Sequence, residues 1–425
     1  MEIRILIIAA NALSQTSNNG KTYRSFLTGI PTNNVAQLYT GTNEYPDLTA
    51  CSHYYRITDL QMLASFCKPW RVIHNTHENL LEAIGDKAPS EIEISSKFIK
   101  LRNLSKKISF LRELVWSTNK WDNHELREWI EEFSPTHIFA VLGNGPALHK
   151  VARKISRRYN IPLYVYFTDD YVINVELQNI IQRLYHKHIM RVYTKTLDQC
   201  KKAFVIGEKM KNAYRDFFRK EFGILVNGIT FETNRPERIK IANDKKVVIS
   251  YIGGIHLNRW KAIVKLARIL NKMKEYSFDI RVFCIQKPNE DILKEFSIAN
   301  VRYCGALTPW GVKDETSKSH IMLHVESFDD SSRASTHYSI STKIPEYMSS
   351  MRGIMAFGPH EVASIEIFSQ NSIGCVLTDL DDEVTIEQKI SQYLDSYNNL
   401  DFDYQYQFAR KHFDKEKMQL IKQLL

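Results

Sequence analysis

The segment 339–359, SISTKIPEYMSSMRGIMAFGP, carries the residues with the clearest chemistry. Ser341, Thr342 and Lys343 directly precede a helical pattern, where free backbone N–H groups and a lysine charge favour an anion such as a diphosphate. Glu346 follows within one turn, and its carboxylate could accept hydrogen bonds from ribose hydroxyls. The segment predicts a nucleotide-binding site. The alternative is a helix-capping loop, with Thr342 as the cap and Glu346 solvated.

Two glycine loops follow apolar segments in the first half of the chain. Asn19 and Gly20 come after the apolar run 3–10, and a glycine there would let the backbone approach a phosphate group of a ligand. Gly143 and Asn144 come after the run 137–142 and could line an acceptor site. The alternatives are an ordinary helix cap at the first loop and a plain turn at the second.

Two aspartates follow the apolar run 163–167, in the sequence Thr168-Asp169-Asp170-Tyr171. The carboxyl end of a parallel strand is where open α/β sheets place their chemistry. Asp169 or Asp170 could therefore orient an acceptor hydroxyl or take its proton, with Tyr171 in contact with the acceptor. The alternative is that one aspartate caps the following helix.

Short apolar runs that alternate with amphipathic stretches must position these residues. The runs predicted as buried strands are 3–10, 35–39, 137–142, 163–167 and 203–206 in the first half, and 247–251, 279–285, 301–303, 321–325, 353–357 and 375–377 in the second. Helical patterns lie between them, for example at 147–159 and 260–273. The repetition predicts an α/β protein with two doubly wound, Rossmann-like parallel sheets.

The length of 425 residues suits two domains. The polar segment 229–244 is interpreted as a linker. It gives a domain 1–228, which holds the candidate acceptor residues, and a domain 229–403, which holds the predicted nucleotide site. The segment 404–425 has the apolar spacing of a helix, which we expect either to pack back on the first domain or to cap its own.

Basic charge is concentrated in the first half of the chain. Residues 1–228 carry 31 Lys and Arg against 22 Asp and Glu, whereas the rest of the chain has 26 of each. Within 97–121 the basic residues recur beside an apolar helical stripe, which is typical of a helix at an anionic membrane surface. Its proposed membrane residues are Lys100, Lys106, Lys107 and Trp116. The alternative is a surface helix whose stripe meets the core. No nucleic-acid motif is recognised, so nucleic acid is not expected as a partner.

The cysteines and the apolar runs indicate the cellular compartment in which the protein is expected. None of the six cysteines forms a C-x-x-C pair, so neither a disulfide framework nor a structural zinc site is expected, and a reducing cytoplasm is favoured. No apolar run reaches the roughly 18 residues of a membrane span. We expect a cytoplasmic protein that binds the inner face of the membrane peripherally.

Several blocks in order along the chain resemble retaining glycosyltransferases of the family-4, or group-1, type. The block IPEYM at 344–348 with IMAFGP at 354–359 resembles their donor-site helix and following strand. The supporting blocks are VIGEKMKNAY at 205–214, LVNGI at 225–229, ISYIGGIHLNR at 249–259 and YCG at 303–305. The resemblance implies the glycosyltransferase B-type fold, in which two Rossmann-like domains face each other across a cleft.

The resemblance also implies roles for individual residues. Glu346 matches the ribose-binding glutamate, Ser341–Lys343 match the diphosphate loop, and Gly254 and Arg259 match the glycine loop with its basic residue, with Lys261 close by. Glu346 is the second glutamate of the family's E-x7-E element, and Tyr338 stands eight residues earlier, where the family has the first. Glu326 is a candidate to replace that carboxylate.

The expected function is a metal-independent, retaining transfer of a sugar from a nucleotide sugar to a hydroxyl of a saccharide acceptor. The basic first half favours a lipid-linked acceptor, as in the synthesis of bacterial capsule or lipopolysaccharide. No cofactor is expected. Two alternatives stay open: a sugar-nucleotide 2-epimerase on the same fold, and a non-catalytic subunit that retains the fold, for which Tyr338 is the main argument.

Overall fold

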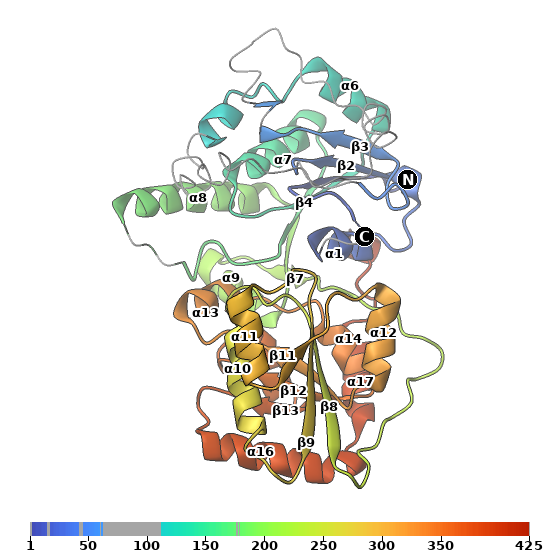
Figure 1. The fold of residues 1–425 in the computed structure, drawn as a ribbon. Coiled ribbons are helices and arrows are strands. Elements are labelled where there is room, and N and C mark those ends of the chain that lie inside the picture. The colour runs from blue at the N-terminus through green and yellow to red at the C-terminus, as the bar shows by residue number, and fades with distance from the viewer. Residues whose placement is uncertain are drawn as a thin grey trace. The chain divides into compact units, whose positions relative to one another are not determined.

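The computed structural model describes residues 2–14, 18–41, 46–59, 61–62, 112–175, 177 and 179–424, with Asn18 and Asn19 described by their backbone alone. These residues form two compact units, one made of Met1–Leu225 with Gln419–Leu425 and the other of Val226–Met418. The boundary after Leu225 lies three residues before the predicted domain boundary. In Figure 1 the first unit runs from blue to green and includes the red C-terminal segment, and the second unit runs from green to red.

The first unit contains a parallel sheet with a Rossmann-type strand order. Its described strands lie in the order β3-β2-β1-β4-β5-β6-β7. They are β1 (Ile5–Ala9), β2 (Val35–Tyr39), β3 (His53–Arg56), β4 (His137–Val141), β5 (Leu163–Phe167), β6 (Lys202–Val205) and β7 (Phe222–Ile224). The described helices are α1 (Asn18–Phe26), η1 (Thr32–Asn34), α6 (His124–Phe133), α7 (Pro146–Tyr159), α8 (Ile180–Gln199), α9 (Glu208–Phe218) and α18 (Leu420–Leu424).

The second unit repeats this arrangement with the strand order β10-β9-β8-β11-β12-β13. The strands are β8 (Lys246–Ile252), β9 (Ser277–Phe283), β10 (Val301–Tyr303), β11 (Ile321–Val325), β12 (Gly353–Phe357) and β13 (Cys375–Leu377). The helices are α10 (Arg259–Leu270), α11 (Glu290–Ile298), α12 (Pro309–Lys318), α13 (Asp330–Thr336), α14 (Ile344–Ser349), α15 (Ala363–Gln370), α16 (Glu383–Ser396), η2 (Tyr397–Asn399) and α17 (Phe402–His412). The parallel pairing confirms the predicted α/β class in both units.

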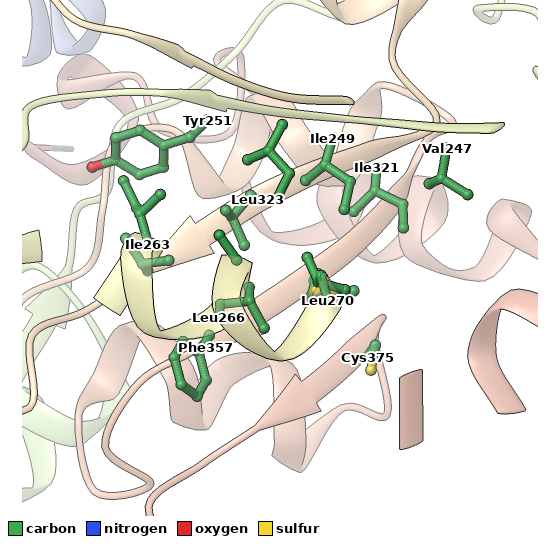
Figure 2. Packing of buried hydrophobic residues seen from close by; sticks show 14 of the residues in the cluster. Val247, Ile249, Tyr251, Ile263, Leu266, Leu270, Ile321, Leu323, Phe357 and Cys375 are labelled. Atoms are coloured by element: carbon green, nitrogen blue, oxygen red, sulfur yellow. The ribbon is translucent and has the colours of Figure 1, made fainter. Parts of the chain in front are cut away.

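Strands of the second sheet are apolar on both faces because helices cover both. Ile321 and Leu323 of β11 belong to a core that includes α10 and α16, whereas Met322 between them belongs to a second core that includes α14, α15 and α17. Figure 2 shows α10 lying over the strands, with Leu266 and Leu270 directed at the sheet. This two-sided burial explains why the strands appear in the sequence as continuous apolar runs.

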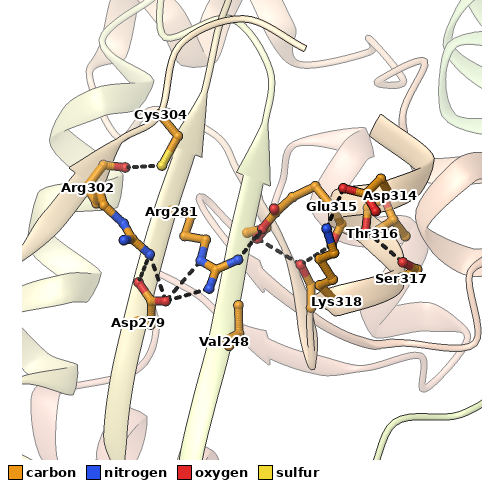
Figure 3. A network of polar contacts seen from close by, with 12 residues as sticks. Val248, Asp279, Arg281, Arg302, Cys304, Asp314, Glu315, Thr316, Ser317 and Lys318 are labelled. Atoms are coloured by element: carbon orange, nitrogen blue, oxygen red, sulfur yellow. Dashed lines mark hydrogen bonds and ion pairs between the residues drawn. The ribbon is translucent and has the colours of Figure 1, made fainter. Parts of the chain in front are cut away.

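A polar network fixes α12 to the second sheet (Figure 3). Arg281 of β9 donates to Asp279 and to Glu315 of α12, and Ser250 of β8 donates to Glu315 over 2.7 Å. Ser250 and Ser319 are fully buried and bond to each other over 2.8 Å. The buried polar groups therefore have partners and do not oppose folding.

The segment 404–425, predicted as one helix, is two helices in different units. α17 packs into the second unit through Phe402 and Tyr406. α18 packs into the first unit, where Leu420 and Leu424 join the core beside α1. Figure 1 places the C-terminus next to α1. Both interpretations of this segment thus hold for part of it. Among the described residues, no helix has both the length and the apolarity of a membrane span.

Candidate functional site

The predicted nucleotide site lies at the carboxyl edge of the second sheet. The loop that follows β8 contains Gly253 and Gly254, and a Cβ on Gly253 would lie 3.4 Å from Cε of Lys343. β8 and β11 are neighbours in the middle of the sheet, where the strand order reverses. Such a reversal point is where open α/β sheets bind their ligands. The glycine loop and Lys343 therefore meet where a bound nucleotide is expected.

Hydrogen bonds to Ser364 and Asn227 hold the loop 341–343 in place. The Ser341 N–H donates to Oγ of Ser364 over 3.0 Å, and the side chain of Asn227 donates to the Thr342 carbonyl over 3.2 Å. The helix α14 begins after Lys343, which is its N-cap residue, so the alternative interpretation of Thr342 as the cap is wrong. Glu346 lies in the first turn of α14 and is half-buried.

Arg259 and Glu326, predicted separately as donor-binding and catalytic residues, are paired with each other. Nη2 of Arg259 lies 2.9 Å from Oε2 of Glu326, and the two side chains are 16% and 3% exposed. Because both carboxylate oxygens accept from the guanidinium, Glu326 is not free to contact a transferred sugar. The expectation that Glu326 replaces the missing family glutamate is therefore wrong.

Lys261 turns to a different partner. Its ammonium lies 2.9 Å from Oδ2 of Asp329, which also accepts from Asn258 over 2.6 Å. The side chain is half exposed. The structure therefore places the predicted donor-binding lysine beside Asp329.

In the first unit the structure brings Gly143, Asp169 and Tyr171 together. A Cβ on Gly143 would lie 3.7 Å from the Tyr171 ring, and the Tyr171 hydroxyl donates to Asp169 over 3.4 Å. Asn144 is exposed beside them. These residues follow β4 and β5 at the carboxyl edge of the sheet, so the predicted acceptor residues share one surface region.

The carboxylate of Asp170 is hydrogen-bonded to its own loop. It accepts from the backbone N–H groups of residues 172–174 and from the Tyr214 hydroxyl, over 2.6–3.0 Å. A carboxylate with four donors is a structural group that fixes the turn before α8. Asp170 therefore stabilises its own turn, and these bonds do not fit the predicted catalytic base. It does not cap the following helix either, because the N-cap of α8 is Asn179.

A buried histidine, His149, holds the Gly143 loop in place by a hydrogen bond to its carbonyl. Nε2 of His149 and the Tyr193 hydroxyl both lie 3.1 Å from the Gly143 carbonyl, which can only accept, so the histidine proton is on Nε2. Burial lowers the pKa of His149 to about 3, and the ring is neutral near pH 7. The sequence analysis missed His149, although its place four residues after Gly145 could have indicated it.

Gly20 is required by packing inside its own unit. A Cβ there would lie 2.4 Å from the Ala12 carbonyl and 2.7 Å from Ser14. Such a distance is not compatible with any side chain, so a ligand is not needed to explain this glycine. The neighbouring Asn19 lies in the first turn of α1, and its side chain is outside the described residues.

The proposed membrane residues fall in two groups. Lys100, Lys106 and Lys107 lie outside the described residues. Trp116 is 3% exposed, and its indole donates to Asp59 over 2.8 Å. Trp116 thus packs inside its unit, as the alternative of a surface helix on the core predicts. The prediction that Trp116 contacts a membrane is wrong.

Within the described residues, one group has the proximity that a metal site needs. The ligand atoms of His360, Glu361 and Asp379 lie within 4.8 Å of one another. Arg333 ion-pairs with both carboxylates and supplies the compensating charge. This arrangement is explained as an ion-pair cluster without a metal.

Comparison with known proteins gives a structural likeness only. No family model matches the sequence, and no curated protein matches it. Among solved structures, sucrose-phosphate synthase (tll1590) from Thermosynechococcus elongatus is 11% identical with a TM-score of 0.60, covering 99% of this chain and 98% of that one. The lipopolysaccharide outer core galactosyltransferase WaaB is 12% identical with a TM-score of 0.60, covering all of both chains. WaaG, a glycosyltransferase involved in lipopolysaccharide biosynthesis, is 10% identical with a TM-score of 0.56, covering 97% of this chain and 98% of that one. These likenesses confirm that the chain has the glycosyltransferase B-type fold.

Proposed function

We propose that this protein is a retaining glycosyltransferase that moves a sugar from a nucleotide-sugar donor to a hydroxyl of a saccharide acceptor. The observation that carries the proposal is the meeting of Lys343 with the Gly253-Gly254 loop at the reversal point of the second sheet. A nucleoside diphosphate needs a cation and close backbone approach, and this corner offers both. Glu346, one turn into α14, is assigned to the ribose.

The reaction follows from where charge develops. When the bond between the sugar and the diphosphate breaks, negative charge grows on the outer phosphate, and Lys343 together with Arg259 stabilises it. These fixed cations take the place of a metal ion, so the transfer is proposed to be independent of metal. The departing phosphate can accept the proton of the acceptor hydroxyl, so no strong base is required.

The acceptor is assigned to the first domain. Gly143, Asn144 and Tyr171 form the proposed contact region, and Asp169 orients the acceptor hydroxyl. The excess of basic residues in 1–228 favours an acceptor that carries phosphate, such as a lipid-linked saccharide. The similarity in fold to WaaB and WaaG favours a role in bacterial surface polysaccharide synthesis, which belongs on the cytoplasmic face of the membrane.

The start of α8 supports peripheral contact with a membrane. Ile180, Ile181 and Leu184 are 73%, 74% and 61% exposed, and the exposed cations Arg183 and Lys187 lie among them. Apolar side chains surrounded by cations suit an interface of anionic lipids. The α8 patch, defined as these five residues, is the proposed contact surface.

The proposal is tested with purified protein and a panel of UDP-, GDP- and dTDP-sugars. We expect thermal stabilisation by one donor class, and transfer or slow hydrolysis of that donor that persists in EDTA, with the product keeping the anomeric configuration of the donor. The variants Lys343→Ala and Glu346→Gln should lose both binding and turnover.

Other outcomes would overturn the proposal in distinct ways. Conversion of the donor into its 2-epimer without loss of nucleotide would identify an epimerase. Binding without any turnover, with Tyr338 where the family glutamate is expected, would identify a non-catalytic subunit. Unchanged turnover in both variants would show that the donor binds elsewhere.

A further inference from the structure

The Arg259–Glu326 pair lies at the reversal point of the second sheet. Arg259 is the first residue of α10, after β8, and Glu326 directly follows β11, where its N–H donates to the Phe357 carbonyl over 3.0 Å. β8 and β11 are the two neighbours at which the strand order reverses. The ion pair therefore joins the two strand ends that border the proposed nucleotide site.

The contact between the two side chains is bidentate. Nε of Arg259 donates to Oε2 of Glu326 over 3.1 Å, and Nη2 lies 3.2 Å from Oε1 and 2.9 Å from Oε2. A bidentate contact sets the plane of the guanidinium as well as its position. The third nitrogen, Nη1, points away from Glu326 and lies 3.5 Å from Nε2 of His256, in the loop that contains the two glycines.

The carboxylate depends on the guanidinium for its charge. Burial raises the pKa of the Glu326 carboxyl, and Arg259 opposes that effect by attraction and hydrogen bonding. His324 lies 3.6 Å from the same carboxylate, but burial lowers its pKa to about 3, so the ring is neutral. A buried ion pair is not needed for stability as such, because apolar residues can replace it at little cost. Its presence at a ligand-binding edge points to a role in the site.

We propose that Glu326 is a positioning residue that orients Arg259, so that Nη1 binds the outer phosphate of a nucleoside diphosphate held by Lys343 and the Gly253-Gly254 loop. Glu326 is too buried to reach the ligand, at 3% exposed, whereas Arg259 is 16% exposed. The inference rests on the proposed function. It adds that the pair recognises the second phosphate and thereby distinguishes a diphosphate from a monophosphate.

The test measures the preference for a diphosphate over a monophosphate. Dissociation constants for UDP and UMP, GDP and GMP, and dTDP and dTMP are measured by calorimetry on the full chain. We expect the wild-type protein to prefer one diphosphate, and Arg259→Ala and Glu326→Gln each to reduce that preference about tenfold or more, because a charged hydrogen bond is lost or misdirected. The double variant should lose no more than either single variant, since both act through one contact.

Two further variants make the result specific. Glu295→Gln on α11 removes the partner of Arg268, which lies on α10 as Arg259 does. This ion pair of 2.7 Å is exposed, and its loss should leave the preference unchanged. Glu326→Asp keeps the charge and should restore part of the preference. It also allows the measurement if Glu326→Gln does not fold.

Each remaining outcome overturns a defined part of the argument. If Glu326→Gln and Glu326→Asp keep the full preference while Arg259→Ala loses it, Glu326 only compensates a buried charge and the inference is wrong. If the losses of preference in the two single variants add up in the double variant, the two residues act independently and the inference is also wrong. If the wild-type protein binds none of the six nucleotides, the proposed function fails, and this inference fails with it.

Discussion

The hydroxyl of Tyr347 bridges both backbone polar groups of Ile252. It accepts from the Ile252 N–H and donates to the Ile252 carbonyl, with both distances 3.2 Å. Tyr347 belongs to α14 and Ile252 ends β8, so one side chain fixes the helix that follows Lys343 to the strand that precedes the glycine loop. Both sides of the proposed phosphate site are therefore held at a fixed separation.

Replacing Tyr347 by Phe should weaken this link without removing the ring. We expect a loss of about 1–3 kcal/mol in the free energy of unfolding, because the buried Ile252 N–H would lose its partner. Urea denaturation followed by circular dichroism measures it. The control is Tyr404→Phe on the exposed face of α17, where Tyr404 is 52% exposed and we expect no significant change. Equal stability of the two variants would contradict the prediction.

Lys343→Ala should lower the affinity for the preferred nucleoside diphosphate about tenfold or more, since one charged contact to phosphate is lost. Calorimetry at two salt concentrations measures the effect, which should shrink at the higher concentration. Lys313→Ala is the matched control, because Lys313 is a 75% exposed lysine of the same domain that pairs with Glu232. A similar loss in both variants would indicate a general effect of charge.

Acid should destabilise the first domain through His149. Its pKa is about 3 in the folded state, below the ordinary value of 6.5, so the unfolded chain binds more protons between these values. Its stabilising contribution is complete above pH 6.5 and decreases as the pH falls toward 3. The slope is at most about 1.4 kcal/mol per pH unit for this one group.

The variant His149→Gln should reduce that slope, since an amide can still donate to the Gly143 carbonyl but does not titrate. Urea denaturation over a pH series between about 5 and 8 measures the slope. His124→Gln is the control, since the His124 side chain is 84% exposed. If both variants keep the wild-type slope, His149 does not contribute to it.

The α8 patch should bind anionic membranes. We expect Ile181→Glu to reduce co-sedimentation with vesicles of phosphatidylglycerol and phosphatidylcholine at least severalfold, because a charge replaces an inserted apolar side chain. Ile298→Glu is the control, as Ile298 is 61% exposed on α11 of the second domain. If both variants co-sediment with the vesicles equally, the patch is not the contact surface. The same holds if the protein binds only vesicles of pure phosphatidylcholine.

Most of the described strands were predictable because they are buried on both faces, whereas the partly buried edge strands β3 and β7 were not predicted. β2, β5, β10, β11, β12 and β13 have the predicted bounds, since a parallel strand between helix layers appears as a short apolar run ended by polar residues. The placement of the glycine loops and aspartates at strand ends followed from the same pattern. Lys343 and Gly253 are 90 positions apart in sequence, and only the strand order brings them together.

The partners of individual side chains could not be predicted. Nothing in the local sequence of Glu326 indicates that Arg259 occupies both of its oxygens, because the contact depends on which strands are neighbours. Asp169 and Asp170 are adjacent and chemically identical, but their partners differ. Asp170 accepts from three backbone N–H groups of its own turn and from the Tyr214 hydroxyl, whereas Asp169 accepts from the Tyr171 hydroxyl. Asn227 and Tyr347 lie in blocks that the sequence identified, but their bonds to the site appear only in three dimensions.

The position of α18 has a consequence for the order of folding. Leu420 and Leu424 complete the core that begins with β1, and the Tyr164 hydroxyl donates to the Leu424 carbonyl over 3.3 Å. On the ribosome, the domain synthesised first must wait for these residues, while the chain of the second domain is made in between. The core of the amino-terminal sheet therefore gains its last residues only after the whole second domain has been synthesised.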